Sequence, residues 1–113
     1  YFTREAFAPL IALAKKLEKG IADVIIKHSM PWHVVRVGAR VEFMCTPKRP
    51  RNGGEAAAVI HRPIDVALHH YLLNRGVIVT PFHNMMLICP ATTEDHVELF
   101  VRRLDECACE LVS

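Results

Sequence analysis

Apolar residues recur at helical spacing along the first part of the chain. Leucine, isoleucine, valine and alanine return every three or four positions from Phe7 to Val24, and lysines and glutamates mostly occupy the other side. This period is typical of a long amphipathic helix. Pro9 fits a first helical turn but would kink a helix interior, so regular helix is expected to begin near Ala8.

The period changes after Pro31. Residues 34–37 and 40–45 are rich in valine and flank Gly38, which predicts two short strands. In the second strand, Val41, Phe43 and Cys45 would share one face. Residues 46–54 hold two prolines, two glycines and three bases, so we expect an exposed loop there and the most mobile segment of the chain.

In the second half of the chain, the apolar pattern and the boundary residues predict a helix, two strands and a last helix. The first helix would follow Pro63 and end near Arg75 and Gly76. A buried strand at 77–80, a turn at 81–84 and a second strand at 85–89 come next. Residues 92–95, Thr-Thr-Glu-Asp, have the character of a capping box in which the acid reaches back to the first turn. The final apolar stripe comprises Val97, Phe100, Val101, Leu104 and Leu111.

Together these elements predict a single α+β domain over residues 1–113. We expect a small, mostly antiparallel sheet of about four strands, with three helices packed on one face. At 113 residues the chain can bury one modest core, and there is no room for a second domain.

Composition narrows the class of protein. An apolar fraction of 51% and a charged fraction of 23% are those of a soluble globular protein, and the apolar runs are too short to cross a bilayer. A net charge of +2 with interleaved acids and bases gives no reason to expect a nucleic-acid partner. Four cysteines without a secretory signal favour a reducing cytoplasm.

Metal binding is not indicated. Cys107 and Cys109 are two positions apart in a helical pattern, so they should lie on different faces and cannot chelate one ion. The chain has seven histidines, but no two of them are four residues apart on a predicted helix.

Two stretches carry a family resemblance. Residues 74–81, Asn-Arg-Gly-Val-Ile-Val-Thr-Pro, and residues 89–95, Cys-Pro-Ala-Thr-Thr-Glu-Asp, together with the order of elements, resemble the C-terminal small domain of class III pyridoxal-phosphate (PLP) aminotransferases. Within that family the chain looks most like the glutamate-1-semialdehyde aminomutase and β-phenylalanine aminotransferase branch. The resemblance covers nearly the whole chain, including the opening helix.

The resemblance implies an enzyme that moves an amino group between an amino acid, α or β, and an oxo acid. Its PLP would be held by a lysine, a carboxylate and phosphate donors of a large domain of the same chain, within a homodimer. The lysines of this segment lie on predicted solvated surfaces, so we assign no catalytic residue here and expect no PLP binding by the isolated segment.

The expected contribution of this domain is recognition of a substrate carboxylate. Many members of the family carry an arginine for this in the strand that here reads Met86-Leu-Ile-Cys89, all apolar. That difference fits the aminomutase branch. Arg75 is the first remaining candidate and Arg40 the second, because a guanidinium pairs bidentately with carboxylates. The alternative for Arg75 is a structural role at the C-terminal end of a helix.

Phe82, His83 and Asn84 form a predicted turn after Pro81, where recognition residues are commonly presented. They could line a substrate pocket or contact a partner subunit, with Phe82 stacking on an aromatic substrate. Equally, they could be ordinary turn residues, with Asn84 suited to unusual backbone angles.

Two hypotheses of different class remain, and a third would make the resemblance a coincidence. The first is a segment of a PLP-dependent aminotransferase or aminomutase, which the absence of an initiator methionine favours and which predicts an apolar sheet face left uncovered in the segment alone. The second is a stand-alone, non-catalytic interaction or ligand-binding module derived from such a domain. The third is an unrelated small α+β regulatory domain.

Overall fold

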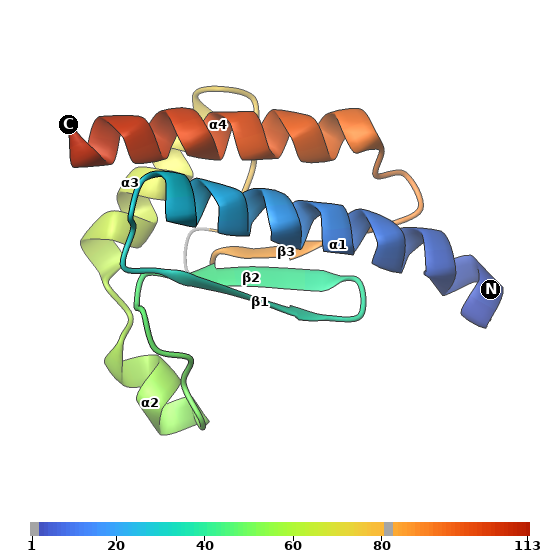
Figure 1. Ribbon diagram of the computed structural model, residues 1–113, viewed down its shortest axis with the longest axis horizontal. Helices are drawn as coiled ribbons and strands as arrows, with labels where there is room; N and C mark the ends of the chain where they lie inside the picture. The colour runs from blue at the N-terminus through green and yellow to red at the C-terminus, as the bar shows by residue number, and fades with distance from the viewer. Residues whose placement is uncertain (1–2, 81–82) are drawn as a thin grey trace.

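The computed structural model describes residues 3–80 and 83–113 and has an α+β architecture, which confirms the predicted class. Figure 1 shows a small sheet with two long helices above it and a short helix below it. In chain order the elements are α1 (Arg4–Lys27), β1 (His33–Val37), β2 (Arg40–Met44), α2 (Gly53–Ala58), α3 (Arg62–Leu73), β3 (Met85–Leu87) and α4 (Glu94–Val112).

The sheet has the order β1-β2-β3, and both pairings are antiparallel. Val34 lies opposite Phe43, and Val41 lies between Arg36 and Met86. Because directly paired residues point to the same side of a sheet, these rows form one face, which we call the inner face. Val41 and Phe43 are buried there, as the alternating pattern predicted.

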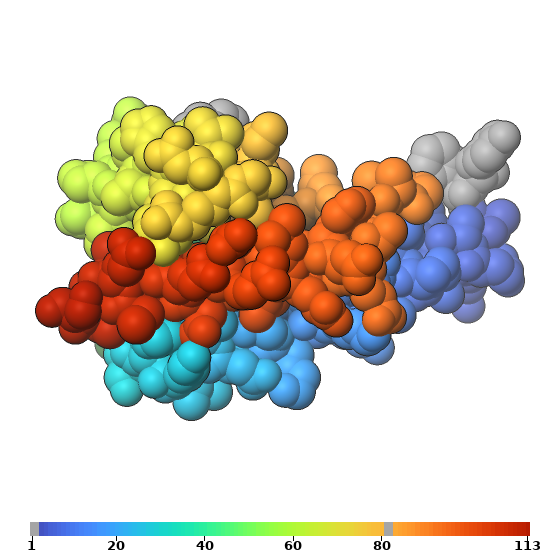
Figure 2. Space-filling model, turned by 90° about the horizontal axis from the view of Figure 1, so that it is seen from above, coloured from blue at the N-terminus to red at the C-terminus, as the bar shows by residue number. Residues whose placement is uncertain are grey.

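The helices cover the inner face in layers. α1 packs on β1 and β2, and α4 packs on α1 and α3. Seen from the helix side, α4 lies between α3 and α1 (Figure 2). The core between these layers consists of Ala14, Leu17, Ile21, Val24, Trp32, Val41, Phe43, Leu68, Leu72, Val79, Ile88, Val97, Phe100, Leu104, Cys107 and Ala108. Trp32 and Phe43 of this core stack with their ring centroids 5.8 Å apart.

The predicted strand at residues 77–80 is not formed, so the described part of the chain has three strands rather than four. Its alternation survives, because Val79 is 4% exposed and Ile78 is 83% exposed. The backbone pairs locally instead, since the Val77 N–H donates to the Leu72 carbonyl of α3 at 2.9 Å. An extended, half-buried segment without a strand beside it gives the same sequence pattern as a strand.

α2 was not predicted. Asn52 caps it by accepting the Glu55 N–H at 2.9 Å, and three alanines complete the helix after Gly53 and Gly54. The glycines and prolines of this region made an all-loop reading plausible, but a good N-cap and alanines suffice for six helical residues. The expected long loop therefore ends at Asn52.

Two helix starts also differ from prediction. α1 begins at Arg4 rather than near Ala8, because Thr3 accepts the Ala6 N–H at 3.2 Å and so caps the helix ahead of Pro9. The cap of α4 is Thr93, and the residue that reaches back to its N–H is His96 rather than an acid.

The end of α4 departs from the predicted stripe. Leu111 is 46% exposed because the last turn of α4 extends beyond α1 (Figure 1).

Cys107 is buried and Cys109 exposed, which confirms that they lie on different faces. All four cysteines are free. No helix within residues 3–80 and 83–113 is long and apolar enough to cross a membrane.

Candidate functional site

A hollow borders the sheet face opposite α1, which we call the outer face. It is a cavity of about 540 Å³ between β1, β2, the segment at 46–52, α2 and the start of α3. α2 projects from the sheet on this side and forms one wall (Figure 1). The polar and titratable residues of the lining include Arg40, Glu42, Cys45, Asp65, His83 and Asn84.

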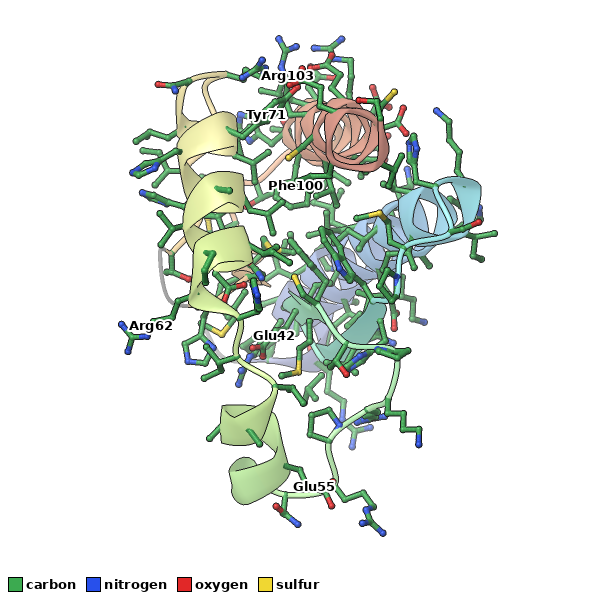
Figure 3. The ribbon with its side chains drawn as sticks, turned by 90° about the vertical axis from the view of Figure 1, so that its left-hand side faces the viewer. Glu42, Glu55, Arg62, Tyr71, Phe100 and Arg103 are labelled. Carbon is green, nitrogen blue, oxygen red and sulfur yellow. The ribbon has the colours of Figure 1, made fainter. Side chains whose placement is uncertain are left out.

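Glu42 organises the charged part of this cavity. One carboxylate oxygen accepts from Nη2 of Arg40 at 2.7 Å, and the other lies 3.1 Å from Nδ1 of His83. The Glu42 side chain is 16% exposed, whereas those of Arg40 and His83 are about half exposed. In Figure 3, Glu42 lies between the sheet and the connection from α2 to α3. The carboxylate thus fixes two sequence-predicted candidates side by side.

Asn84, just before β3, forms hydrogen bonds to α3 and to β2. Its side-chain amide donates to Oδ1 of Asp65 in α3 at 3.0 Å, and its carbonyl accepts the Phe43 N–H of β2 at 3.1 Å. The residue is only 7% exposed. Its bonds place Asn84 in the cavity wall, with its amide already engaged by the protein.

Cys45 and His33, which also line the cavity, are not arranged for covalent chemistry. Burial, with a smaller effect of the nearby Asp65 carboxylate, raises the pKa of Cys45 to about 12, so its thiol stays protonated at neutral pH and is a poor nucleophile. Nδ1 of His33 lies 2.6 Å from the Thr46 carbonyl, which requires Nδ1 to carry the proton. Recognition rather than covalent chemistry is the role this lining can support.

Arg75, the first sequence candidate, lies elsewhere. It follows the C-terminal end of the twelve-residue α3, whereas the cavity borders the N-terminal end, about 18 Å away at the helical rise per residue. Its guanidinium stacks on the Tyr71 ring at 3.5 Å and lies 3.7 Å from Glu110 of α4. Tyr71 lies beside α4 in Figure 3, away from Glu42. The structure therefore brings Arg40, His83 and Asn84 together and leaves Arg75 apart.

The remaining candidate, Phe82, is outside the described residues. Glu42 and Asp65 were not predicted as site residues. Glu42 carries a usable signal, because it is two positions from Arg40 in a predicted strand and must share its face. Asp65 had none, since its contact with Asn84 spans 19 residues of sequence.

The described residues do not fit a PLP anchor. All five lysines are exposed, and three of them are paired with acids: Lys16 with Glu94, Lys19 with Asp23 and Lys27 with Asp105. None lies in the buried, desolvated setting that an imine-forming lysine occupies. Residues 3–80 and 83–113 also contain no group of three or more histidine, cysteine or acidic side chains that could hold a metal ion.

The chain is similar in sequence and structure to known proteins. No protein-family model matches the chain. A structure of a glutamate-1-semialdehyde-aminomutase from Pseudomonas aeruginosa PAO1 matches 96% of this chain and 24% of its own, with 49% identity and a TM-score of 0.92. The Glutamate-1-semialdehyde 2,1-aminomutase 1 of Macrococcus caseolyticus (strain JCSC5402) is 30% identical over 95 residues, which are 82% of this chain and 22% of that protein.

A more distant likeness concerns the fold alone. A β-phenylalanine aminotransferase from Variovorax paradoxus is 16% identical over 96% of this chain, with a TM-score of 0.86. An omega-transaminase from Sphaerobacter thermophilus is 21% identical over 98% of this chain, with a TM-score of 0.84.

The fold is therefore that of a segment of class III aminotransferases, as the sequence predicted. Within that class, the chain is similar in sequence to glutamate-1-semialdehyde aminomutases. It spans about a quarter of the length of these relatives.

Proposed function

We propose that this chain is the C-terminal small domain of a PLP-dependent aminotransferase or aminomutase acting on an amino acid and an oxo acid. The observation that carries the proposal is 49% identity over 96% of the chain to a glutamate-1-semialdehyde-aminomutase. One solved structure of that enzyme is in complex with PMP, which supports a pyridoxal cofactor in the parent enzyme. The alternative of a stand-alone module has no structural observation in its favour.

In this proposal the cofactor and its lysine belong to a large domain elsewhere in the same polypeptide. The exposed, paired lysines of this segment agree with that division. PLP would supply the electron sink for amino transfer, and this domain would contribute to substrate binding and closure. The complete enzyme would be a homodimer of the cytoplasm, where four free cysteines are stable as thiols.

Arg40 is the better candidate for the substrate carboxylate. It borders the cavity, and Glu42 holds one of its terminal nitrogens at 2.7 Å, which restricts the guanidinium without occupying its full donor set. A pre-oriented guanidinium loses less side-chain entropy when it pairs with a carboxylate. His83, held by the same Glu42, would line the pocket next to it.

The test is steady-state kinetics of the complete enzyme with glutamate-1-semialdehyde and with amino-acid donors. Arg40→Ala should raise KM for the carboxylate substrate at least about tenfold, because a hydrogen bond to a charged group is lost. Arg75→Ala is the matched control and should leave KM unchanged. An Arg40→Ala enzyme with unaltered KM would remove Arg40 from the site, and a complete protein without amino transfer would refute the proposed function.

A further inference from the structure

The short helix α2 stands apart from the rest of the fold. None of its residues is buried, and it packs against no other helix or strand of the described chain. Figure 3 shows it away from the sheet, with Glu42 on the sheet side and Glu55 at its far end. A helix of six residues is marginal by itself, and packing in the core does not account for the position of this one.

Local bonds keep α2 helical in this position. Asn52 accepts the Glu55 N–H at 2.9 Å. The Glu55 carboxylate accepts from the Arg51 backbone N–H at 2.8 Å and from Nη2 of the same arginine at 2.8 Å. These bonds fix the first turn of the helix. The apolar residues that follow take no part in them and are available to line the cavity.

The second half of α2 and the residues after it form an apolar wall of the cavity. We call this set the α2 wall, and it consists of Ala56, Ala57, Val59 and Ile60. Ala58 belongs to the same helix but does not line the cavity. Ile60 is 52% exposed, and Ala57 is exposed as well. An apolar group that displaces water from such side chains gains free energy.

The charged part of the cavity lies on the sheet side, where Glu42 holds Arg40 and His83. A ligand whose carboxylate pairs with Arg40 can extend either along the α2 wall or toward Arg49, which also lines the cavity. Arg49 has no acidic partner among residues 3–80 and 83–113, but it is exposed to water. Because water competes for an exposed guanidinium, pairing there gains little, which favours the apolar wall.

We propose that the α2 wall selects substrates by an apolar side chain, which packs against Ala56 and Ala57 while the substrate carboxylate pairs with Arg40. The inference rests on the proposed function and names its substrate class: an amino acid, or the matching oxo acid, whose side chain is aliphatic or aromatic. The role of α2 would then be substrate specificity, which explains a helix that contributes nothing to the core.

The test is the kcat/KM of the complete enzyme for alanine, norvaline, norleucine and glutamate, and for their β-amino isomers. The first three differ only in the length of an aliphatic chain, and glutamate ends its chain in a second carboxylate. Each added methylene should raise kcat/KM about fourfold, the value expected for burial of one methylene. Glutamate should be at least about tenfold poorer than norvaline, because its second carboxylate would lie against the apolar wall.

Ala57→Leu tests the wall itself. The added isopropyl group fills part of the cavity, so the ratio of kcat/KM for norleucine to that for alanine should fall at least about tenfold. Ala58→Leu is the matched control, because it makes the same change on the same helix at a residue that does not line the cavity. It should leave that ratio unchanged.

The outcomes that would overturn the inference are distinct from those that would refute the proposed function. Equal kcat/KM along the aliphatic series, or a preference for glutamate over norleucine, would overturn the apolar wall, and the second result would assign the end of the chain to Arg49. Equal effects of Ala57→Leu and Ala58→Leu would overturn it too. Activity on glutamate-1-semialdehyde alone would overturn the inference and keep the proposed function, whereas no amino transfer with any substrate would refute both.

Discussion

At the scale of single residues, the packing of α1 against α4 depends on Gly20 of α1. A Cβ placed there would lie 2.6 Å from Cγ2 of Val101 in α4, well inside van der Waals contact. Valine is stiff about its first side-chain torsion and cannot rotate away cheaply. Gly20→Ala should therefore lower the free energy of unfolding by about 1–3 kcal/mol, measured by urea denaturation.

The control for Gly20→Ala is Gly53→Ala at the start of α2. A Cβ at Gly53 meets nothing within 4 Å, so this substitution should leave stability unchanged or raise it slightly. The Gly20→Ala/Val101→Ala double variant should recover part of the loss, because the clashing methyl groups are removed. Equal stabilisation by both glycine substitutions would contradict the close packing.

Arg75 should act on stability rather than on substrate binding. Arg75→Ala removes its stacking on Tyr71 and its approach to Glu110, so the free energy of unfolding should fall by about 0.5–1 kcal/mol. Arg75→Lys keeps the charge but not the planar stack, and should recover only part of the loss. Thermal unfolding measures both variants, and an unchanged midpoint in Arg75→Ala would show that the contact contributes nothing.

The candidate residues show what sequence can supply at this scale. Arg40 and His83 could be named from their residue types and their places in a strand and a turn. Their common partner Glu42 fixes their relative position, and the His83–Glu42 contact spans 41 residues, which no local pattern encodes. Arg75 is the first candidate from sequence because it stands next to Gly76 at a predicted helix end, although in space it belongs to the α3–α4 contact.

At the scale of elements, Asp105 of α4 ties down the end of α1. Its carboxylate lies 2.8 Å from Lys27 Nζ and 2.7 Å from Nε2 of His28. Hydrogen bonds from Lys27 and then His28 hold the pKa of Asp105 below its ordinary value. A carboxyl whose pKa is lower in the folded state contributes stability above its unfolded pKa and loses it as pH falls through the folded value.

The corresponding prediction concerns stability in acid. Unfolding free energy of the unmodified chain should fall more steeply than that of Asp105→Asn as pH drops below the ordinary range of aspartate. Near neutral pH, Asp105→Asn should be the less stable protein. Glu98→Gln, an exposed acid of the same helix, controls for the loss of one negative charge. Parallel pH profiles for Asp105→Asn and the unmodified chain would contradict the role of this cluster.

The elements themselves were predictable where period and boundary signals agreed. α1, α3 and α4, the β1–β2 hairpin and β3 all have such signals. The prediction of a strand at residues 77–80 was wrong because alternation indicates burial on one side and not the presence of a neighbouring strand. α2 was not predicted because its stability depends on the Asn52 cap within a segment of loop-like composition.

At the scale of the whole molecule, the two sides of the sheet differ in the chemistry of their surfaces. The charged sides of the helices face away from the sheet, and the outer face carries the cavity, the Arg40–Glu42 pair and the exposed side chains of Val37 and Leu87. The sequence predicted this uncovered apolar face from the resemblance to a larger enzyme. It could not predict the cavity, because α2 and the start of α3 form its walls through contacts distant in sequence.

The central claim is that this chain is part of an enzyme about four times as long. Determining the reading frame upstream of the Tyr1 codon in the source DNA tests it most directly. The account predicts an open frame extending to roughly four times this length, as the similar aminomutases have, with a large domain that includes the PLP lysine. A stop codon followed by a start signal just upstream of the Tyr1 codon would contradict the account and support an independent, non-catalytic module.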